Sequence, residues 1–173
     1  MSASVHETRR RFLLGAGGGL LLAAILPRLA AADEALEIGM SGTPTGSDVW
    51  FRPRGLLLRP GQAVRWVNRD TGNVHTTTAY HPANGKPLRI PTGAKPWHSD
   101  YLLPGQSFTV MFDIPGVYDY FCLPHEHAGM VGRIVVGDAS VAYPYADTDA
   151  QLPPAAVAGF PDVAAILKQG RVG

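Results

Sequence analysis

The sequence has little of two things, cysteine and net charge. Its 173 residues include one cysteine, Cys122, so an internal disulfide cannot form and the fold must rely on its own core. The 15 Lys+Arg and 14 Asp+Glu residues nearly cancel. Nucleic-acid binding requires a strong basic excess, so the composition excludes that function class.

The sequence also lacks an uninterrupted apolar run of the ~20 residues that a membrane-spanning helix needs. The apolar stretch 12–26 is diluted by glycines, follows Arg9, Arg10 and Arg11, and precedes the small residues 30–32. This order is typical of an export signal, and the arginines before Phe12 resemble a bacterial twin-arginine signal. We expect residues 1–32 to be such a signal, cleaved near Ala32. We therefore expect a periplasmic protein without a stable membrane anchor, and we disfavour the alternative of an N-terminal membrane helix.

Residues 33–173 are expected to form an all-β fold. The leader holds four arginines and one glutamate, so the remainder keeps 11 basic and 13 acidic residues. The 14 prolines, the abundant glycines and the short apolar runs of residues 33–173 favour strands and turns. Phe108, Val110 and Phe112 alternate with Ser107, Thr109 and Met111 and should face between two sheets. The expected strands are 35–40, 55–58, 63–68, 75–79, 107–112, 116–121 and 132–136.

Two segments do not show strand periodicity. Residues 80–101 contain four prolines and should form a long ordered loop. In the extension 138–173, Val163, Ile166 and Leu167 have helical spacing. Pro161 suits the first helical position, and Gly170 suits the end. We expect one short helix packed on the main domain, residues 33–137; a helix that docks a partner is the alternative.

Metal-binding side chains surround the single cysteine. Cys122, His125 and Met130 place a thiolate, an imidazole and a thioether within nine residues. Soft sulfur with imidazole selects copper or zinc, and two His, one Cys and a weak axial Met describe a blue-copper electron-transfer site. His75 is the candidate for the second histidine, because it follows a strand-like stretch and a turn and starts the β-branched run 76–78.

This segment resembles the ligand loop of the cupredoxins, the type 1 blue copper proteins, in their plastocyanin and halocyanin branch. The family pattern Cys-x-x-His-x-x-x-x-Met is present as Cys122, His125 and Met130, with Tyr118 four residues before the Cys and Gly129 before the Met. The resemblance covers roughly residues 35–137 and implies a Greek-key β-sandwich or barrel. It also implies one copper bound by His75, Cys122, His125 and Met130. One departure is Thr76, where the family has Asn; its N–H and hydroxyl are expected to link the two ligand loops instead.

The function implied by the resemblance is the carriage of single electrons between transient redox partners by a monomer that is not an enzyme. A copper carrier or delivery protein is the alternative. Within the loop, His127 is a rival ligand to His125. An enzyme would need a second copper bound by His81, His98 or His127.

Overall fold

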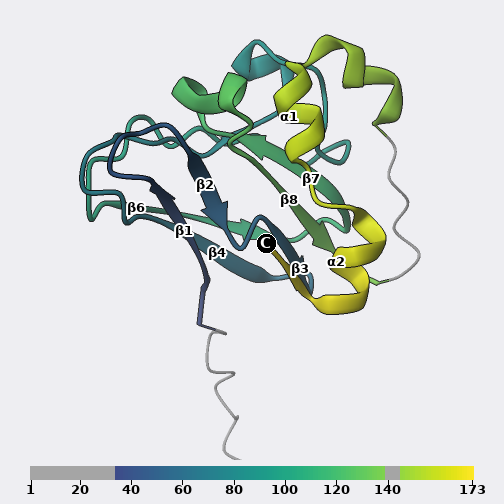
Figure 1. Cartoon of the computed structure of the whole chain (residues 1–173). Coiled ribbons are helices and arrows are strands. Elements are labelled where there is room, and N and C mark those ends of the chain that lie inside the picture. Colours follow the sequence, from purple (N-terminus) through teal and green to yellow (C-terminus); the bar gives the residue numbers. More distant parts are fainter. Residues whose placement is uncertain (1–33, 139–144) are drawn as a thin grey trace, which may run out of the picture. The chain divides into compact units, whose positions relative to one another are not determined.

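The computed structural model of the protein describes residues 34–138 and 145–173. The residues form two β-sheets, which Figure 1 shows as separate layers. The first sheet has the order β2-β1-β4-β6 and contains β1 (Leu36–Gly42), β2 (Val49–Arg52), β4 (Gln62–Asn68) and β6 (Ser107–Phe112). The second has the order β5-β7-β8-β3-β9 and contains β3 (Gly55–Leu58), β5 (Thr78–Ala79), β7 (Gly116–Phe121), β8 (Val131–Val136) and β9 (Arg171–Val172).

The chain crosses between the two sheets several times, and β3 to β7 lie alternately in the second and the first sheet. The two sheets confirm the expected all-β sandwich. β1 pairs in parallel with β4, and β3 pairs in parallel with β8, while the other pairs are antiparallel. β2 and β9 were not expected from the sequence. The strand expected at 75–79 is reduced to β5, because the backbone of His75 pairs with Leu102 in an isolated bridge outside the sheets.

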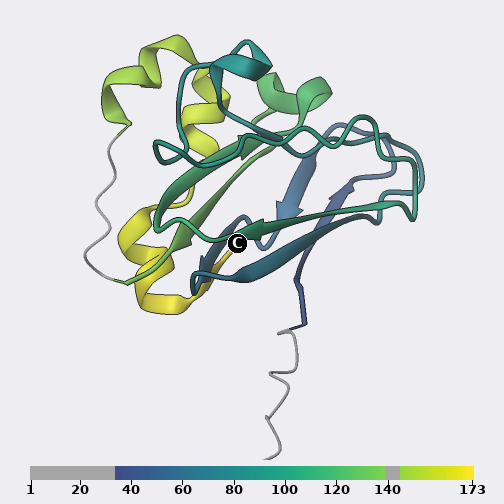
Figure 2. The same ribbon diagram turned by 180° about the vertical axis from the view of Figure 1, so that it is seen from behind.

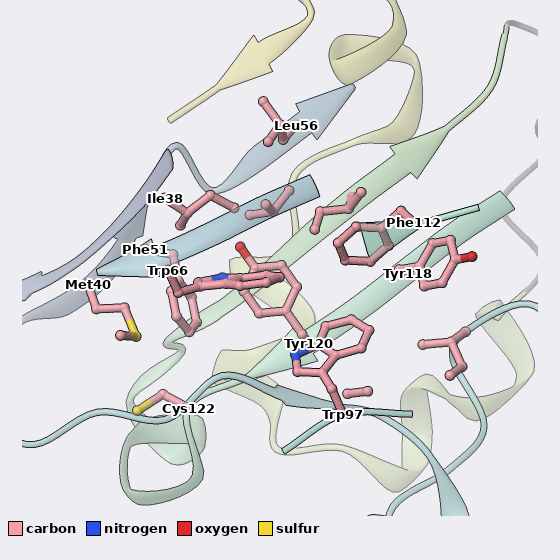
Figure 3. Close-up of a cluster of buried hydrophobic side chains, with 14 of the residues drawn as sticks. Ile38, Met40, Phe51, Leu56, Trp66, Trp97, Phe112, Tyr118, Tyr120 and Cys122 are labelled. Carbon is pink, nitrogen blue, oxygen red and sulfur yellow. The ribbon is translucent and has the colours of Figure 1, made fainter. Parts of the chain in front are cut away.

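The core lies between the sheets and is rich in aromatic side chains. Figure 3 shows Trp66, Trp97, Phe112 and Tyr120 packed together, with Cys122 at one end of the cluster. The ring centroids of Trp66 and Tyr120 are 5.3 Å apart in an edge-on arrangement, which aromatic pairs favour. Along β6 the inward residues 108, 110 and 112 contact this core and the alternate residues are exposed, as the sequence pattern predicted.

The C-terminal segment packs on the second sheet. The expected helix is α2 (Val163–Gln169), and a further helix, α1 (Pro154–Gly159), precedes it. Both lie along the β7–β8–β3 layer, which Figure 2 shows from behind. α2 begins at Val163 rather than at Pro161, because the Asp162 carboxylate accepts a hydrogen bond from the N–H of Ala165 and so caps the helix.

A buried charge network joins the long segment 80–101 to this C-terminal part. The Arg89 guanidinium donates to Asp119 Oδ2 at 2.8 Å and to Asp149 Oδ1 at 2.7 Å. Asp119 also accepts from Arg133, whose Nη1 donates to the carbonyl of Pro161. Segment 80–101 has no strand and contains the 3₁₀ turn η1 (Pro82–Asn84).

No helix within residues 34–138 and 145–173 is both long enough and apolar enough to cross a membrane. The expected export signal, residues 1–32, lies outside the described residues.

Candidate metal centre

Two loops at one end of the sandwich supply the candidate ligands. His75 lies between β4 and β5, and its backbone is fixed by hydrogen bonds in both directions with Leu102. Cys122 directly follows β7 and precedes the 3₁₀ turn η2 (Leu123–Ala128), which carries His125. The N–H of Cys122 donates to the carbonyl of Met130 at 3.0 Å, so the thiol and the start of β8 are joined across the base of the loop.

The ligand loop closes at Gly129, and no other residue could easily take the place of this glycine. Gly129 has φ 78°, a left-handed conformation that L side chains rarely adopt. A Cβ at this position would also lie 2.9 Å from the carbonyl oxygen of Ala155 in α1. Helix α1 therefore packs directly against the loop that carries His125 and Met130.

His75, Cys122 and His125 bring their donor atoms together. Cys122 Sγ lies 3.6 Å from His75 Nδ1 and 3.4 Å from His125 Nδ1, and the three donors all lie within 4.8 Å of one another. A first-row metal such as zinc, bound ~2.3 Å from sulfur and ~2.0 Å from nitrogen, would hold those atoms about 3.5–3.7 Å apart at ordinary coordination angles. The donor set therefore fits one metal ion.

The other candidate residues take different places. Met130 is fully buried in the same core cluster as Cys122, directly after Gly129. His127 is exposed on η2 and is not part of the donor group. His81 accepts from the N–H of Ala83, and His98 shares a hydrogen bond with Thr78. Among the described residues, the three donors form the only such group of His, Cys and acidic side chains.

Thr76 links the two loops through its N–H and its hydroxyl, as expected of a residue that replaces the Asn of the family pattern. Its N–H points at the Cys122 sulfur at 3.3 Å, and its hydroxyl accepts from the N–H of Leu123 at 2.8 Å. Pro124 has no N–H to offer the sulfur. The thiol is thus held by a backbone donor from the His75 loop.

Burial determines which of the three donor side chains carry a proton when no metal is bound. Desolvation raises the pKa of the Cys122 thiol to about 11, although hydrogen bonds oppose it. Desolvation also lowers the pKa of His75, although the hydrogen bond that its ring makes to Asp70 opposes the shift, and it lowers the pKa of His125. At neutral pH the metal-free site therefore holds a thiol and two neutral imidazoles.

Sequence reasoning missed two buried carboxylates beside the site. Asp70 Oδ2 lies 3.2 Å from His75 Nε2, on the side of the ring away from the sulfur. Burial would raise the pKa of Asp70, but hydrogen bonds from Asn73, Gly72 and His75 outweigh it and lower the pKa to about 2. Glu126 lies inside η2 and accepts from the Tyr80 hydroxyl at 2.9 Å and from Lys86. Only its position next to a ligand could have marked Glu126 in the sequence.

Comparison with known proteins identifies a family and several relatives of this chain. The family described as "Copper binding proteins, plastocyanin/azurin family" matches residues 39–137. Plastocyanin from Scenedesmus fuscus is 37% identical over 55% of this chain and 93% of its own length. Pseudoazurin from Methylorubrum extorquens is 34% identical over 75% of this chain and 78% of its own. The solved structure of pseudoazurin from Methylobacterium extorquens AM1 has 28% identity, covers 59% of this chain and 76% of its own, and has a TM-score of 0.45.

The matched region holds most of the two sheets, both loops that supply the donor atoms and the buried cysteine between them. The chain therefore belongs to the plastocyanin/azurin family of copper-binding proteins.

Proposed function

We propose that this protein carries single electrons between redox partners through one copper ion held by His75, Cys122 and His125, with Met130 as a weak axial ligand. The observation that carries the proposal is the meeting of two neutral imidazoles and one thiol in a closed site of the sandwich. Bound there, copper supplies a one-electron couple, because both Cu(II) and Cu(I) accept this ligand set.

The candidate ligands are suited to electron transfer because hydrogen bonds hold each of them in place. His75 is fixed by Leu102, Cys122 by Thr76 and Met130, and His125 by its backbone bond to the carbonyl of Cys122. Donors that are positioned before the metal binds need little rearrangement when the charge of the site changes. This arrangement favours a carrier over a delivery protein, which needs exchangeable and exposed ligands.

His125 is the proposed point of electron entry and exit. His75 is fully buried, whereas the His125 ring is half-buried and thus has an edge that reaches solvent. Exposed apolar residues of the same turn flank His125 in the sequence, including Leu123 at 44% exposure, Pro124 and Ala128. A small apolar patch suits brief docking of a redox partner, since weak electron-transfer complexes bury little surface.

We further propose that the protein is not an enzyme and acts as a monomer. A catalytic metal needs an open coordination position, and Met130 would fill the axial place. His81 and His98 make hydrogen bonds within the 75–100 region and lie outside the donor group.

The location and the division of the chain are proposals supported by the sequence alone. Residues 1–32 would direct export to the periplasm by a twin-arginine route and be removed near Ala32. Residues 33–137 would be the copper domain, with 138–173 as an extension packed on it. Mass spectrometry of the protein purified from the periplasm would detect a new N-terminus near Asp33, and an intact leader would contradict this.

Metal binding should release about one proton per copper ion at pH 7. The thiol is protonated there because its pKa is raised to about 11, whereas both imidazoles are already neutral because their pKa values are lowered. Calorimetry in two buffers of different ionisation enthalpy measures the release. A wild-type release no larger than that of Cys122→Ser would contradict the assignment of the thiol as ligand.

Cys122→Ser should abolish the intense blue colour of the oxidised copper protein, because that colour is charge transfer from thiolate to copper. Absorption spectra of equally copper-loaded samples make the measurement. His127→Ala is the control and should keep the colour, since His127 is exposed outside the donor group. An intensely blue Cys122→Ser protein would overturn the function.

Met130→Leu should keep the blue colour and raise the reduction potential. Loss of the thioether weakens binding of Cu(II) more than of Cu(I), and each tenfold change in their ratio shifts a one-electron potential by about 59 mV. Voltammetry measures this shift. Met111→Leu is the matched control, because Met111 is 63% exposed on β6 and should leave the potential unchanged. A lower potential in Met130→Leu would argue against axial ligation.

A further inference from the structure

The far side of the buried His75 ring faces a carboxylate. The Nδ1 atom of His75 lies toward Cys122 Sγ, and its Nε2 atom lies 3.2 Å from Asp70 Oδ2. Both side chains are almost fully enclosed, with 0% exposure for His75 and 5% for Asp70. Neither water nor another side chain is needed to satisfy Nε2, because the carboxylate oxygen already does so.

The two oxygens of Asp70 have separate tasks. Oδ1 accepts from the N–H groups of Gly72 and Asn73 at 2.9 and 3.1 Å, which shapes the turn before His75. Oδ2 accepts from the side-chain amide of Asn73 and is the atom that faces His75. The turn thus uses both oxygens, and Oδ2 in addition contacts the His75 ring, which lies outside the turn.

The charge on Asp70 is not neutralised by a cation. Within residues 34–138 and 145–173, no lysine or arginine forms an ion pair with Asp70, and the neighbouring Arg69 pairs with Glu37 instead. Asn68 holds the backbone of Asp70 by accepting its N–H at 2.9 Å. Strand β1 also approaches closely, since a Cβ at Gly42 would lie 2.7 Å from Oδ2. A fixed negative charge therefore lies directly behind one ligand.

We propose that Asp70 is a positioning residue that completes an Asp70–His75–copper relay, which fixes the metal-binding tautomer of His75 and lowers the reduction potential of the site. The inference rests on the proposed function, in that it assumes His75 is a copper ligand. A carboxylate behind a metal-bound histidine orients the ring and raises its basicity.

The tautomer follows from the hydrogen bond. A neutral imidazole carries one proton, and an ionised carboxylate can only accept. The proton must therefore sit on Nε2, which leaves the lone pair of Nδ1 directed toward the sulfur and free to bind metal. The ring is prepared for copper before copper binds.

The effect on the potential follows from charge. A buried negative charge stabilises the dipositive oxidised ion more than the monopositive reduced ion, and the enclosed surroundings strengthen the interaction. The hydrogen bond acts in the same direction, because a more basic imidazole favours Cu(II). Removal of the charge should thus raise the potential.

Asp70→Asn tests the proposal, because the amide oxygen can keep the turn while its NH₂ group cannot accept from Nε2. Glu126→Gln is the matched control: it removes another buried carboxylate of the ligand region, but one that contacts Tyr80 and Lys86 and no ligand ring. We expect Asp70→Asn to weaken Cu(II) binding relative to Cu(I) at least tenfold, a rise of about 59 mV or more. Glu126→Gln should give a clearly smaller rise. Equal shifts, or no shift in Asp70→Asn, would overturn the proposal.

A second measurement needs neither copper nor a variant. Nitrogen-15 NMR of the metal-free wild-type protein reports which ring nitrogen of His75 carries the proton, and we expect Nε2. A proton on Nδ1 would overturn the proposal even if Asp70→Asn fails to fold. A wild-type copper protein without a blue one-electron couple would instead refute the proposed function, so the two failures are distinguishable.

Discussion

The site depends on one contact between two loops that are 46 residues apart in the chain. The N–H of Thr76 points at the sulfur of Cys122, and the hydroxyl of Thr76 accepts from the N–H of Leu123. These two bonds place His75 beside the thiol and fix the start of the turn that carries His125. If the loops separated, the three donor atoms would no longer surround one point. The arrangement of the three donor atoms thus depends on the link that Thr76 makes between the loops.

Support for the ligand loop comes largely from outside the two sheets. Helix α1 packs on the loop at Gly129, and segment 80–101 contributes Tyr80 and Lys86, both of which hold Glu126. Arg89 of the same segment forms ion pairs with Asp119 in β7 and with Asp149 in the C-terminal extension. Buried ion pairs of this kind add little net stability but are strongly destabilising when one partner is lost. The extension and the long segment therefore act together as a scaffold around the site.

The sequence predicted the fold class and the Cys122–His125 part of the donor group because both depend on local spacing, whereas His75 lies 47 residues before Cys122. Cys122 and His125 share one short loop, and the alternation along 107–112 assigns an inward face without tertiary knowledge. Asp70 lies in the turn that the sequence predicts before His75, but its contact with the His75 ring could be assigned only once the fold placed the two side chains together. Arg89 and Asp119 could not be predicted, since the burial of a charge depends on partners far away in the chain. Strand β9 was missed because it has only two residues and exists through its pairing with β3.

The most direct test of this account is a reductive titration of the copper-loaded, oxidised protein, followed by its visible spectrum and a metal count. We expect one copper per chain and an intense blue colour. One electron equivalent should bleach that colour, and reoxidation should restore it. A colourless protein, a metal count above one per chain, or a colour that needs more than one electron to bleach would contradict a single-electron carrier built on His75, Cys122 and His125.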